Sequence, residues 1–154
     1  MAKYFTYSEF TKSTKADSLG IDNIPKEEKI QDNILELMHV MDIIRDGWTY
    51  ICEENCWDSP AIVITSGYRC NALNQAVGGS DTSAHKIGSA CDFKAQNGRN
   101  KELLEYAHQV LITNCINWDQ LINEKPDSYG KPSWIHLGLR NNKNQQRKQY
   151  KTLC

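Results

Sequence analysis

The distribution of hydrophobic residues predicts one long helix in the first third of the chain. Apolar residues recur there at alternating steps of four and three, the spacing of one face of an α-helix over roughly six turns. The stripe consists of Ile30, Ile34, Leu37, Met41, Ile44, Trp48 and Ile51. Pro25 suits the start of this helix, and Gly47 is expected to end or kink it early. A coiled-coil seam has the same pattern, but nothing extends it past Pro60, so we expect a core helix packed on a sheet.

Two shorter features precede this helix. Thr6 and Glu9 have the spacing of a capping box, which predicts a short helix reaching Phe10. Residues 15–23 are expected to form a loop, because Gly20 and neighbouring Asp and Asn residues are typical of turns.

Beyond the long helix, β-branched and alternating runs predict four strands. They are residues 61–65, 88–95, 118–124 and 134–139. Between them we expect a short helix over residues 71–77 and a second helix that Asn100 caps. Residues 80–86 and 125–133 are expected to be loops.

Alternation within the strands places several polar side chains on one face. Asp92 points away from the apolar side of its strand, because Cys91 and Phe93 on either side of it share that side. If the last two strands pair antiparallel, Glu124 and His136 lie close together on one face.

The C-terminal segment, residues 140–154, is basic and polar. One interpretation is a solvated surface segment. The alternative is a final edge strand around residues 147–152, since lysine commonly protects sheet edges from further pairing.

Composition narrows the class of protein. A chain of 154 residues is most simply one domain, spanning residues 1–154. The net charge of −1 gives no general attraction to nucleic acid or to anionic membranes, so we expect neither as a partner. No apolar run approaches the ~18 residues of a membrane span, and the first residues lack the apolar segment of a secretory signal. We therefore expect the protein to be made in the cytosol without a signal peptide. We also expect a monomer.

Six cysteines are present, none of them in a Cys-x-x-Cys pair that would indicate a zinc knuckle. Cytosolic synthesis favours free thiols, and we expect the cysteines to serve as small buried hydrophobic residues.

The candidate chemistry lies in two histidines and one aspartate. His85 and Asp92 are seven residues apart, and His136 lies in a later strand. Two imidazoles and a carboxylate suit Zn²⁺, and three protein ligands leave a position for water, as in catalytic zinc sites. The spacing alone is a weak signal, because a histidine and an aspartate seven residues apart occur by chance in many chains as a surface-loop histidine and a strand-end aspartate. The other two histidines, His39 and His108, are expected to have no functional role.

A set of motifs resembles the zinc D-Ala-D-Ala carboxypeptidase family, which includes bacteriophage cell-wall endopeptidases. The motifs are Ser66-Gly67-Tyr68-Arg69, Asn74 with Gly78-Gly79, Ser83-x-His85-x-x-Gly88-x-Ala90-x-Asp92, and Trp134-Ile135-His136. The similarity extends to Phe5, Glu9-Phe10, Ile21-Asp22-Asn23 and Asp119-Gln120-Leu121-Ile122, so it covers nearly the whole chain. It is closest to the compact members found in phages and prophages.

This resemblance implies an α+β fold of the hedgehog/DD-peptidase kind, with a small antiparallel sheet and flanking helices. It implies Zn²⁺ held by His85, Asp92 and His136. It also implies cleavage of peptide bonds in the peptidoglycan stem next to D-amino acids, as a carboxypeptidase or endopeptidase. A phage lysis enzyme that acts on the cell wall after release from the cytosol fits this reading.

The same resemblance suggests roles for side chains around the metal. Arg69 would face the substrate carboxylate or the developing oxyanion, for which a guanidinium offers paired hydrogen bonds. Ser83 would bind substrate or brace the ligand loop. Trp134 and Gln120 are further candidates for substrate binding, although Trp134 suits core packing equally well.

The general base is the position where this sequence departs from its relatives. Several relatives have an acidic residue three positions before the second histidine ligand, where this chain has Ser133; others have a histidine at the position of Trp134. We expect Glu124 to act as the base, with Asp127 as second choice. The missing acid leaves open a non-catalytic wall-binding or virion structural module on the same fold. A D,D-dipeptidase is a further alternative that differs only in substrate size.

Overall fold

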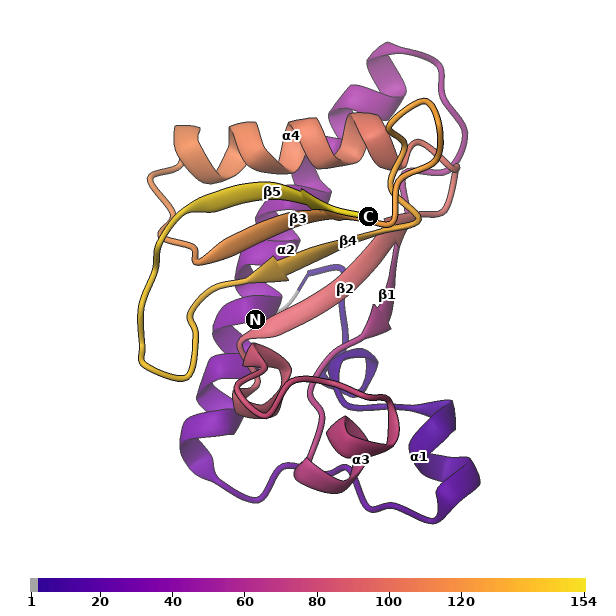
Figure 1. The fold of residues 1–154 in the computed structure, drawn as a ribbon. Helices are drawn as coiled ribbons and strands as arrows, with labels where there is room; N and C mark the ends of the chain where they lie inside the picture. Colours follow the sequence, from indigo (N-terminus) through magenta and orange to yellow (C-terminus); the bar gives the residue numbers. More distant parts are fainter. Residues whose placement is uncertain (1–2) are drawn as a thin grey trace.

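The computed structural model describes residues 3–154, which form a five-stranded sheet with the long helices on one face and shorter helices beyond its end (Figure 1). Met1 and Ala2, which begin the stretch considered as a signal segment, lie outside the described residues. In chain order the elements are the 3-10 helix η1 (Tyr7–Phe10), α1 (Thr14–Leu19), α2 (Glu28–Glu54), β1 (Ile62–Ser66), α3 (Asn71–Ala76), the 3-10 helix η2 (Ala84–Ile87), β2 (Ala90–Ala95), α4 (Asn100–Thr113), β3 (Gln120–Glu124), β4 (Trp134–Gly138) and β5 (Gln149–Leu153).

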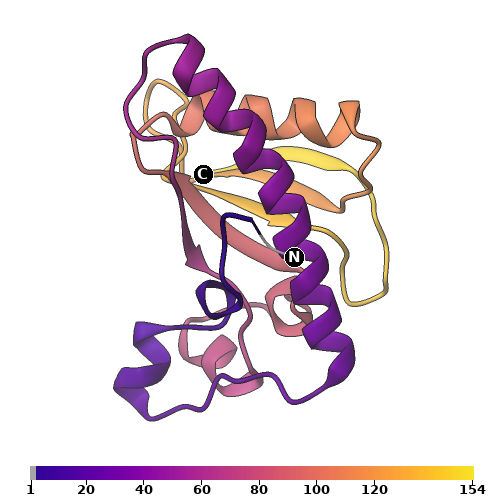
Figure 2. The ribbon, with the colours of Figure 1, turned by 180° about the vertical axis from the view of Figure 1, so that it is seen from behind.

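The predicted long helix is confirmed as α2, which crosses one face of the sheet and lies in front of it in Figure 2. The middle of its apolar stripe is almost fully buried: Ile34, Leu37, Met41, Ile44 and Trp48 are each at most 1% exposed. These side chains share one core with α4 and with the apolar face of the sheet. No helix within residues 3–154 is long and apolar enough to cross a membrane.

The expectation that Gly47 ends the helix early is wrong, because α2 continues to Glu54, whereas a kink at this residue stays a prediction. A Cβ atom at position 47 would collide with the ring of Tyr106 on α4. The glycine therefore allows the two helices to approach each other and does not act as a terminator.

The sheet has the strand order β1-β2-β4-β3-β5. The first four strands pair antiparallel, as expected, so the α+β architecture is confirmed. The C-terminal segment is not simply a solvated surface segment, because it ends in the edge strand β5. This strand pairs in parallel with β3, so the sheet is not wholly antiparallel. Gln120 at the start of β3 faces both Gly138 and Gln149, so the chain crosses the start of β3 on its way from β4 to β5.

Two segments expected to be loops contain helical turns. Residues 15–23 include most of α1, which Ser13 caps by accepting a hydrogen bond from the Ala16 backbone N–H at 3.1 Å. The turn residue Gly20, at φ 66°, ends this helix. The Ser83 hydroxyl caps η2 in the same way, through the His85 N–H at 3.2 Å. The predicted capping box at Thr6 is confirmed by a hydrogen bond of 2.6 Å from its N–H to the Glu9 carboxylate.

The expectation that the cysteines are buried holds only for Cys52 and Cys91. Cys56, Cys115 and Cys154 are exposed. Cys56 and Cys115 follow the ends of α2 and α4, where the chain turns with φ of 54° and 53° and leaves the core.

Candidate metal centre

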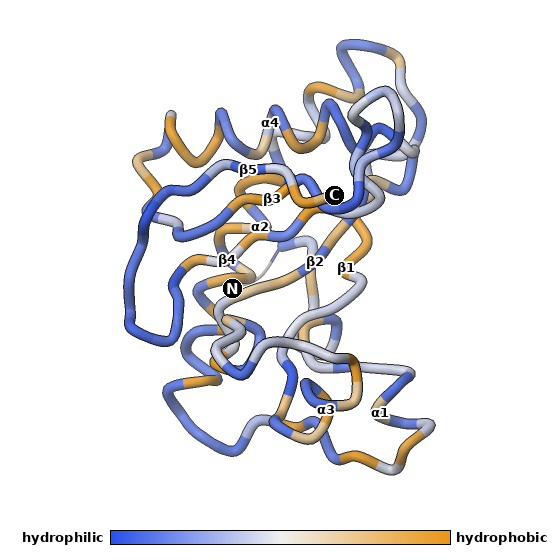
Figure 3. The backbone as a smooth tube through the Cα atoms, viewed as in Figure 1, coloured by the Kyte–Doolittle hydropathy of each residue, from blue (hydrophilic) through white to orange (hydrophobic). Residues whose placement is uncertain are grey.

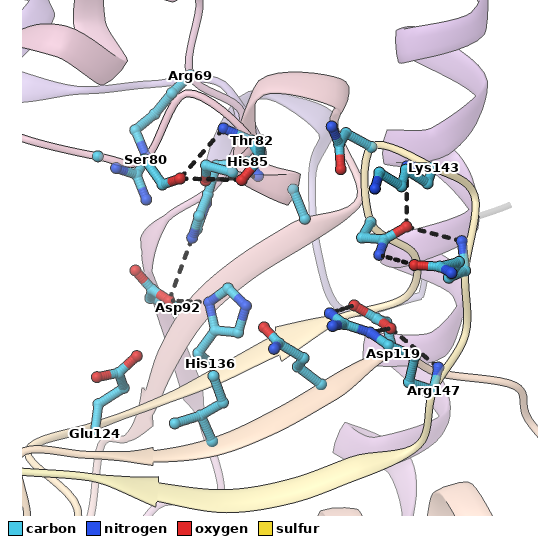
Figure 4. Close-up of a pocket in the computed structure, with 18 of the residues that line it drawn as sticks. Arg69, Ser80, Thr82, His85, Asp92, Asp119, Glu124, His136, Lys143 and Arg147 are labelled. Atoms are coloured by element: carbon cyan, nitrogen blue, oxygen red, sulfur yellow. Dashed lines mark hydrogen bonds and ion pairs between the residues drawn. The ribbon is translucent and has the colours of Figure 1, made fainter.

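On the side of the sheet opposite α2 and α4, His85, Asp92 and His136 lie close together (Figure 4). Asp92 on β2 lies directly opposite His136 on β4 in the antiparallel register. Facing residues of neighbouring strands point to the same side of a sheet, so the two side chains meet. His85 comes from η2, and Gly88 at φ 76° turns the chain from η2 toward β2.

The distances within this cluster suit one metal ion. Asp92 Oδ1 lies 3.5 Å from His85 Nε2 and 3.0 Å from His136 Nδ1. One ligand atom from each residue lies within 4.8 Å of the others. Ligand atoms around a tetrahedral zinc ion are about 3.3 Å apart, given zinc–ligand distances of about 2.0–2.1 Å. The three residues therefore fit a metal site in both donor type and spacing.

A backbone carbonyl orients the His85 ring. His85 Nδ1–H donates to the Gly67 carbonyl oxygen at 2.7 Å, so Nε2 keeps its lone pair and faces Asp92. The loop bearing Gly67 is itself held, because Tyr68 N–H donates to the Phe10 carbonyl at 2.7 Å and Arg69 N–H donates to the His85 carbonyl at 3.0 Å. The N-terminal segment thus helps to hold the loop whose carbonyl orients His85.

The protonation states also suit metal binding. Burial lowers the pKa of His85, although hydrogen bonding and charge from Asp92 oppose this. Burial alone would raise the pKa of Asp92, but hydrogen bonds and charge from the two histidines outweigh it and hold that pKa well below its usual range. A neutral imidazole and an ionised carboxylate are the forms that bind metals.

A cavity of about 610 Å³ surrounds the cluster. It is lined by every other side chain that the sequence nominated except Asp127: Arg69, Ser83, Gln120, Glu124 and Trp134. Asp127 borders a different cavity, and its Oδ1 accepts hydrogen bonds of 2.9 Å from the N–H groups of Tyr129 and Lys131. Asp127 stabilises its own loop, so the structure does not place the second-choice base at the site.

Arg69 lines this cavity and brings a positive charge to it (Figure 4). Its buried Nε has no hydrogen-bond partner within residues 3–154. Gly79 leaves room for it, since a Cβ there would lie 2.9 Å from Arg69 Nη1. Burial lowers the pKa of Arg69 and Asp92 acts to raise it, but guanidinium groups stay charged in proteins.

Glu124 lies at the end of β3 on the same side of the sheet as the cluster (Figure 4). It faces Trp134 across the β3–β4 pair, two residues along from the pair of Ile122 and His136 and so on the same face. Burial raises the pKa of Glu124, with His136 lowering it and Asp92 raising it further. Within residues 3–154 its carboxylate accepts no hydrogen bond from protein groups, which leaves it available to take a proton.

Several cavity residues were not anticipated from the sequence: Ser80, Thr82, Asp119, Asn141, Asn142, Lys143, Gln145 and Arg147. Asp119 could have been predicted from the sequence, because it begins one of the motifs that resemble the family. The residues of the C-terminal segment could not, since a polar loop has no periodicity that indicates its position. His39 is exposed, and the His108 ring packs against Tyr150 with centroids 3.9 Å apart, so neither histidine lines the cavity.

Comparison with known proteins gives one family. No curated protein sequence matches the chain significantly. A family model described as Peptidase M15 matches residues 3–138, which include all three cluster residues, Arg69 and Glu124. Peptidases of this family are metal-dependent, in agreement with the cluster. The chain therefore belongs to the M15 peptidases, the metallopeptidase family of the zinc D-Ala-D-Ala carboxypeptidase type that its motifs resemble.

Proposed function

We propose that this protein is a zinc-dependent peptidase that hydrolyses peptide bonds of the peptidoglycan stem next to D-amino acids. One observation supports it most strongly. His85, Asp92 and His136 share a cavity with Arg69 and Glu124, whose charged groups have no hydrogen-bond partner or ion pair within residues 3–154. A ligand set, a cation and a free carboxylate in one cavity are the parts that metal-assisted hydrolysis requires.

Zinc held by the three ligands would supply a water of lowered pKa and polarise the peptide carbonyl. Glu124 is the residue that takes the proton from the attacking water and passes it to the leaving amine. Its raised pKa suits both steps, because a group that titrates nearer neutral pH can accept and then donate. Glu124 thus takes the place of the acidic residue that relatives have at the position of Ser133.

Arg69 stabilises negative charge on the substrate, either a terminal carboxylate or the oxygen of the carbonyl under attack. The half-buried Trp134 offers an apolar surface along the cavity, and Gln120 offers an amide. Ser83 already uses its hydroxyl to cap η2, so its main part is to hold the turn that carries His85. These groups bind and orient the peptide.

The test is a digest of purified muropeptides, followed by mass spectrometry, with and without a chelator. We expect stem peptides to lose mass only when the chelator is absent. His85→Ala and Glu124→Gln should abolish cleavage, while Glu54→Gln, at the exposed end of α2, should retain it. Unchanged masses with fully zinc-loaded protein would contradict the proposal.

Substrate size is tested in the same assay. Free D-Ala-D-Ala cleaved in preference to a pentapeptide would indicate a D,D-dipeptidase. A pentapeptide cleaved in preference to the free dipeptide would indicate a carboxypeptidase or endopeptidase.

We propose that the protein acts at the cell wall after release from the cytosol, as in the phage lysis enzymes that the motifs resemble.

The second candidate is a non-catalytic wall-binding or virion structural module. Ser133 favours it, because its hydroxyl donates to the Lys125 carbonyl at 2.6 Å and offers no acid. Intact cell-wall sacculi that retain the protein without releasing peptides would support this candidate.

A further inference from the structure

The loop of residues 140–148, between β4 and β5, forms one wall of the cavity. Its contributions are the side chains of Asn141, Asn142, Lys143, Gln145 and Arg147. Figure 4 shows Lys143 and Arg147 on one side of the cluster and Arg69 and Glu124 on the other. The loop lies beyond residues 3–138, so the family match does not account for it.

This loop is hydrophilic along its length (Figure 3), yet it is fixed at several points. Arg147 Nε and Nη2 donate to the two carboxylate oxygens of buried Asp119 at 2.7 and 2.8 Å. At the other end, Arg140 Nη2 donates to both carboxylate oxygens of Glu36 at 2.8 and 2.9 Å. Because these contacts hold the loop without a ligand, the loop loses little conformational freedom when a ligand binds.

Inside the loop, Asn141 sets the turn that places Lys143 at the cavity. Its Oδ1 accepts hydrogen bonds from the N–H groups of Lys143 at 3.0 Å and Gln145 at 2.8 Å. The loop is thus a preformed wall.

Among the charged side chains of this loop that line the cavity, Lys143 is the cation without a counter-ion in the described part of the chain. Asp119 balances the guanidinium of Arg147, whereas Lys143 forms no ion pair within residues 3–154. Asn142 adds an amide to the wall that can pair with a peptide group. The cavity of about 610 Å³ is large enough for a ligand well beyond a dipeptide. The wall therefore suits a peptide that carries an anionic group away from the bond to be cut.

We propose that the 140–148 loop is a specificity subsite in which Lys143 binds a carboxylate of the stem peptide that is remote from the scissile bond. This inference rests on the proposed function. Two groups of the stem offer such a carboxylate: the α-carboxylate of γ-linked D-glutamate and the free carboxylate of diaminopimelate. Both present the same chemistry to Lys143, so the experiment must separate them.

The experiment compares kcat/KM for stem peptides that carry each carboxylate with the same peptides amidated at that position. The wild type should prefer one carboxylate over its amide by up to about fivefold, the upper end of what an exposed ion pair contributes. Lys143→Ala should bring the two values together, and Lys143→Arg should restore the preference. Lys101→Ala on α4, also exposed and outside the cavity, should keep it. The carboxylate whose amidation lowers kcat/KM in the wild type but not in Lys143→Ala is the one that Lys143 binds.

The outcomes separate this inference from the proposed function. Cleavage with no carboxylate preference, or with a preference that Lys143→Ala leaves unchanged, would overturn the subsite and leave the peptidase intact. If no peptide is cleaved, the proposed function fails, and equilibrium binding of the same peptides decides the subsite. A carboxylate preference in binding that Lys143→Ala abolishes would support it, and equal binding of all peptides would overturn it.

Discussion

Single atoms determine what each residue of this site can do. The Gly67 carbonyl fixes which nitrogen of His85 is free, through a hydrogen bond of 2.7 Å to Nδ1. Gly67 has no room for a side chain, because a Cβ there would lie 2.8 Å from Phe10 Cα. The motif Ser66-Gly67-Tyr68-Arg69 thus combines two tasks: its second residue orients a ligand and its fourth faces the cavity.

At this scale the prediction concerns Glu124. Burial raises its pKa above the ordinary 4.5, and a general base works only when ionised, so kcat/KM should fall as the pH drops through a value above 4.5. Glu124→Gln should lower kcat by about 10²–10⁴-fold and remove this acidic limb. The measurement is the pH profile of both proteins with a stem-peptide substrate.

Glu54→Gln serves as the control and should keep the wild-type profile. A Glu124→Gln variant that retains both its rate and its acidic limb would exclude Glu124 as the base.

At the scale of elements, the sequence predicted those whose pattern is local. The stripe of α2 and the alternation of β2 and β4 follow from periodicity, and both are observed. The helix α1 was missed because its turn residues lie at its end rather than in a loop. The direction of β5 and the course of the 140–148 loop depend on the distant contacts of Arg147 with Asp119 and Arg140 with Glu36, which no local pattern reveals.

The α2–α4 contact gives a prediction with an unusual sign. Alanine normally favours a helix over glycine by about 1 kcal/mol. Gly47→Ala should nevertheless lower the free energy of unfolding by about 1–3 kcal/mol, because its Cβ overlaps the Tyr106 ring. Urea denaturation measures this, and Tyr106→Phe in the same chain should recover part of the loss. A more stable Gly47→Ala protein would show that the helices are not in close contact there.

The attachment of β5 should depend on pH. Burial acts to raise the pKa of Asp119, but hydrogen bonds and charge from Arg147 outweigh it and lower that pKa below 3.8. A lowered folded-state pKa means that the stabilisation is present at neutral pH and is lost as the pH falls below about 4. Arg147→Ala should therefore lower the free energy of unfolding at pH 7, and should lower it progressively less in acid.

Thermal or urea unfolding of wild type and Arg147→Ala from pH 3 to 7 checks this dependence, with Lys101→Ala as the matched loss of one exposed cation. A difference that stays constant over this range would show that the Asp119 ion pair does not hold the strand.

At the scale of the whole molecule, the two faces of the sheet have different tasks. One face packs on α2 and α4 and forms the core, while the other carries the cluster and the cavity. This division explains why the site was harder to predict than the core. His85 and Asp92 are seven residues apart, a spacing common in unrelated chains, and only the register of β2 with β4 brings His136 to them. The prediction of the metal ligands depended on the resemblance of the motifs to a known family. The family match ends at residue 138, before the 140–148 loop.

Zinc titration of the metal-free protein by calorimetry, with His85→Ala and His39→Ala as a matched pair, tests the metal centre most directly. We predict one ion per chain in the wild type and in His39→Ala, whose exposed histidine lies outside the cavity. Affinity should fall by more than about 100-fold in His85→Ala, since loss of an outer partner alone typically costs about 10–100-fold. Equal zinc affinity in all three proteins would show that His85, Asp92 and His136 are not the metal site.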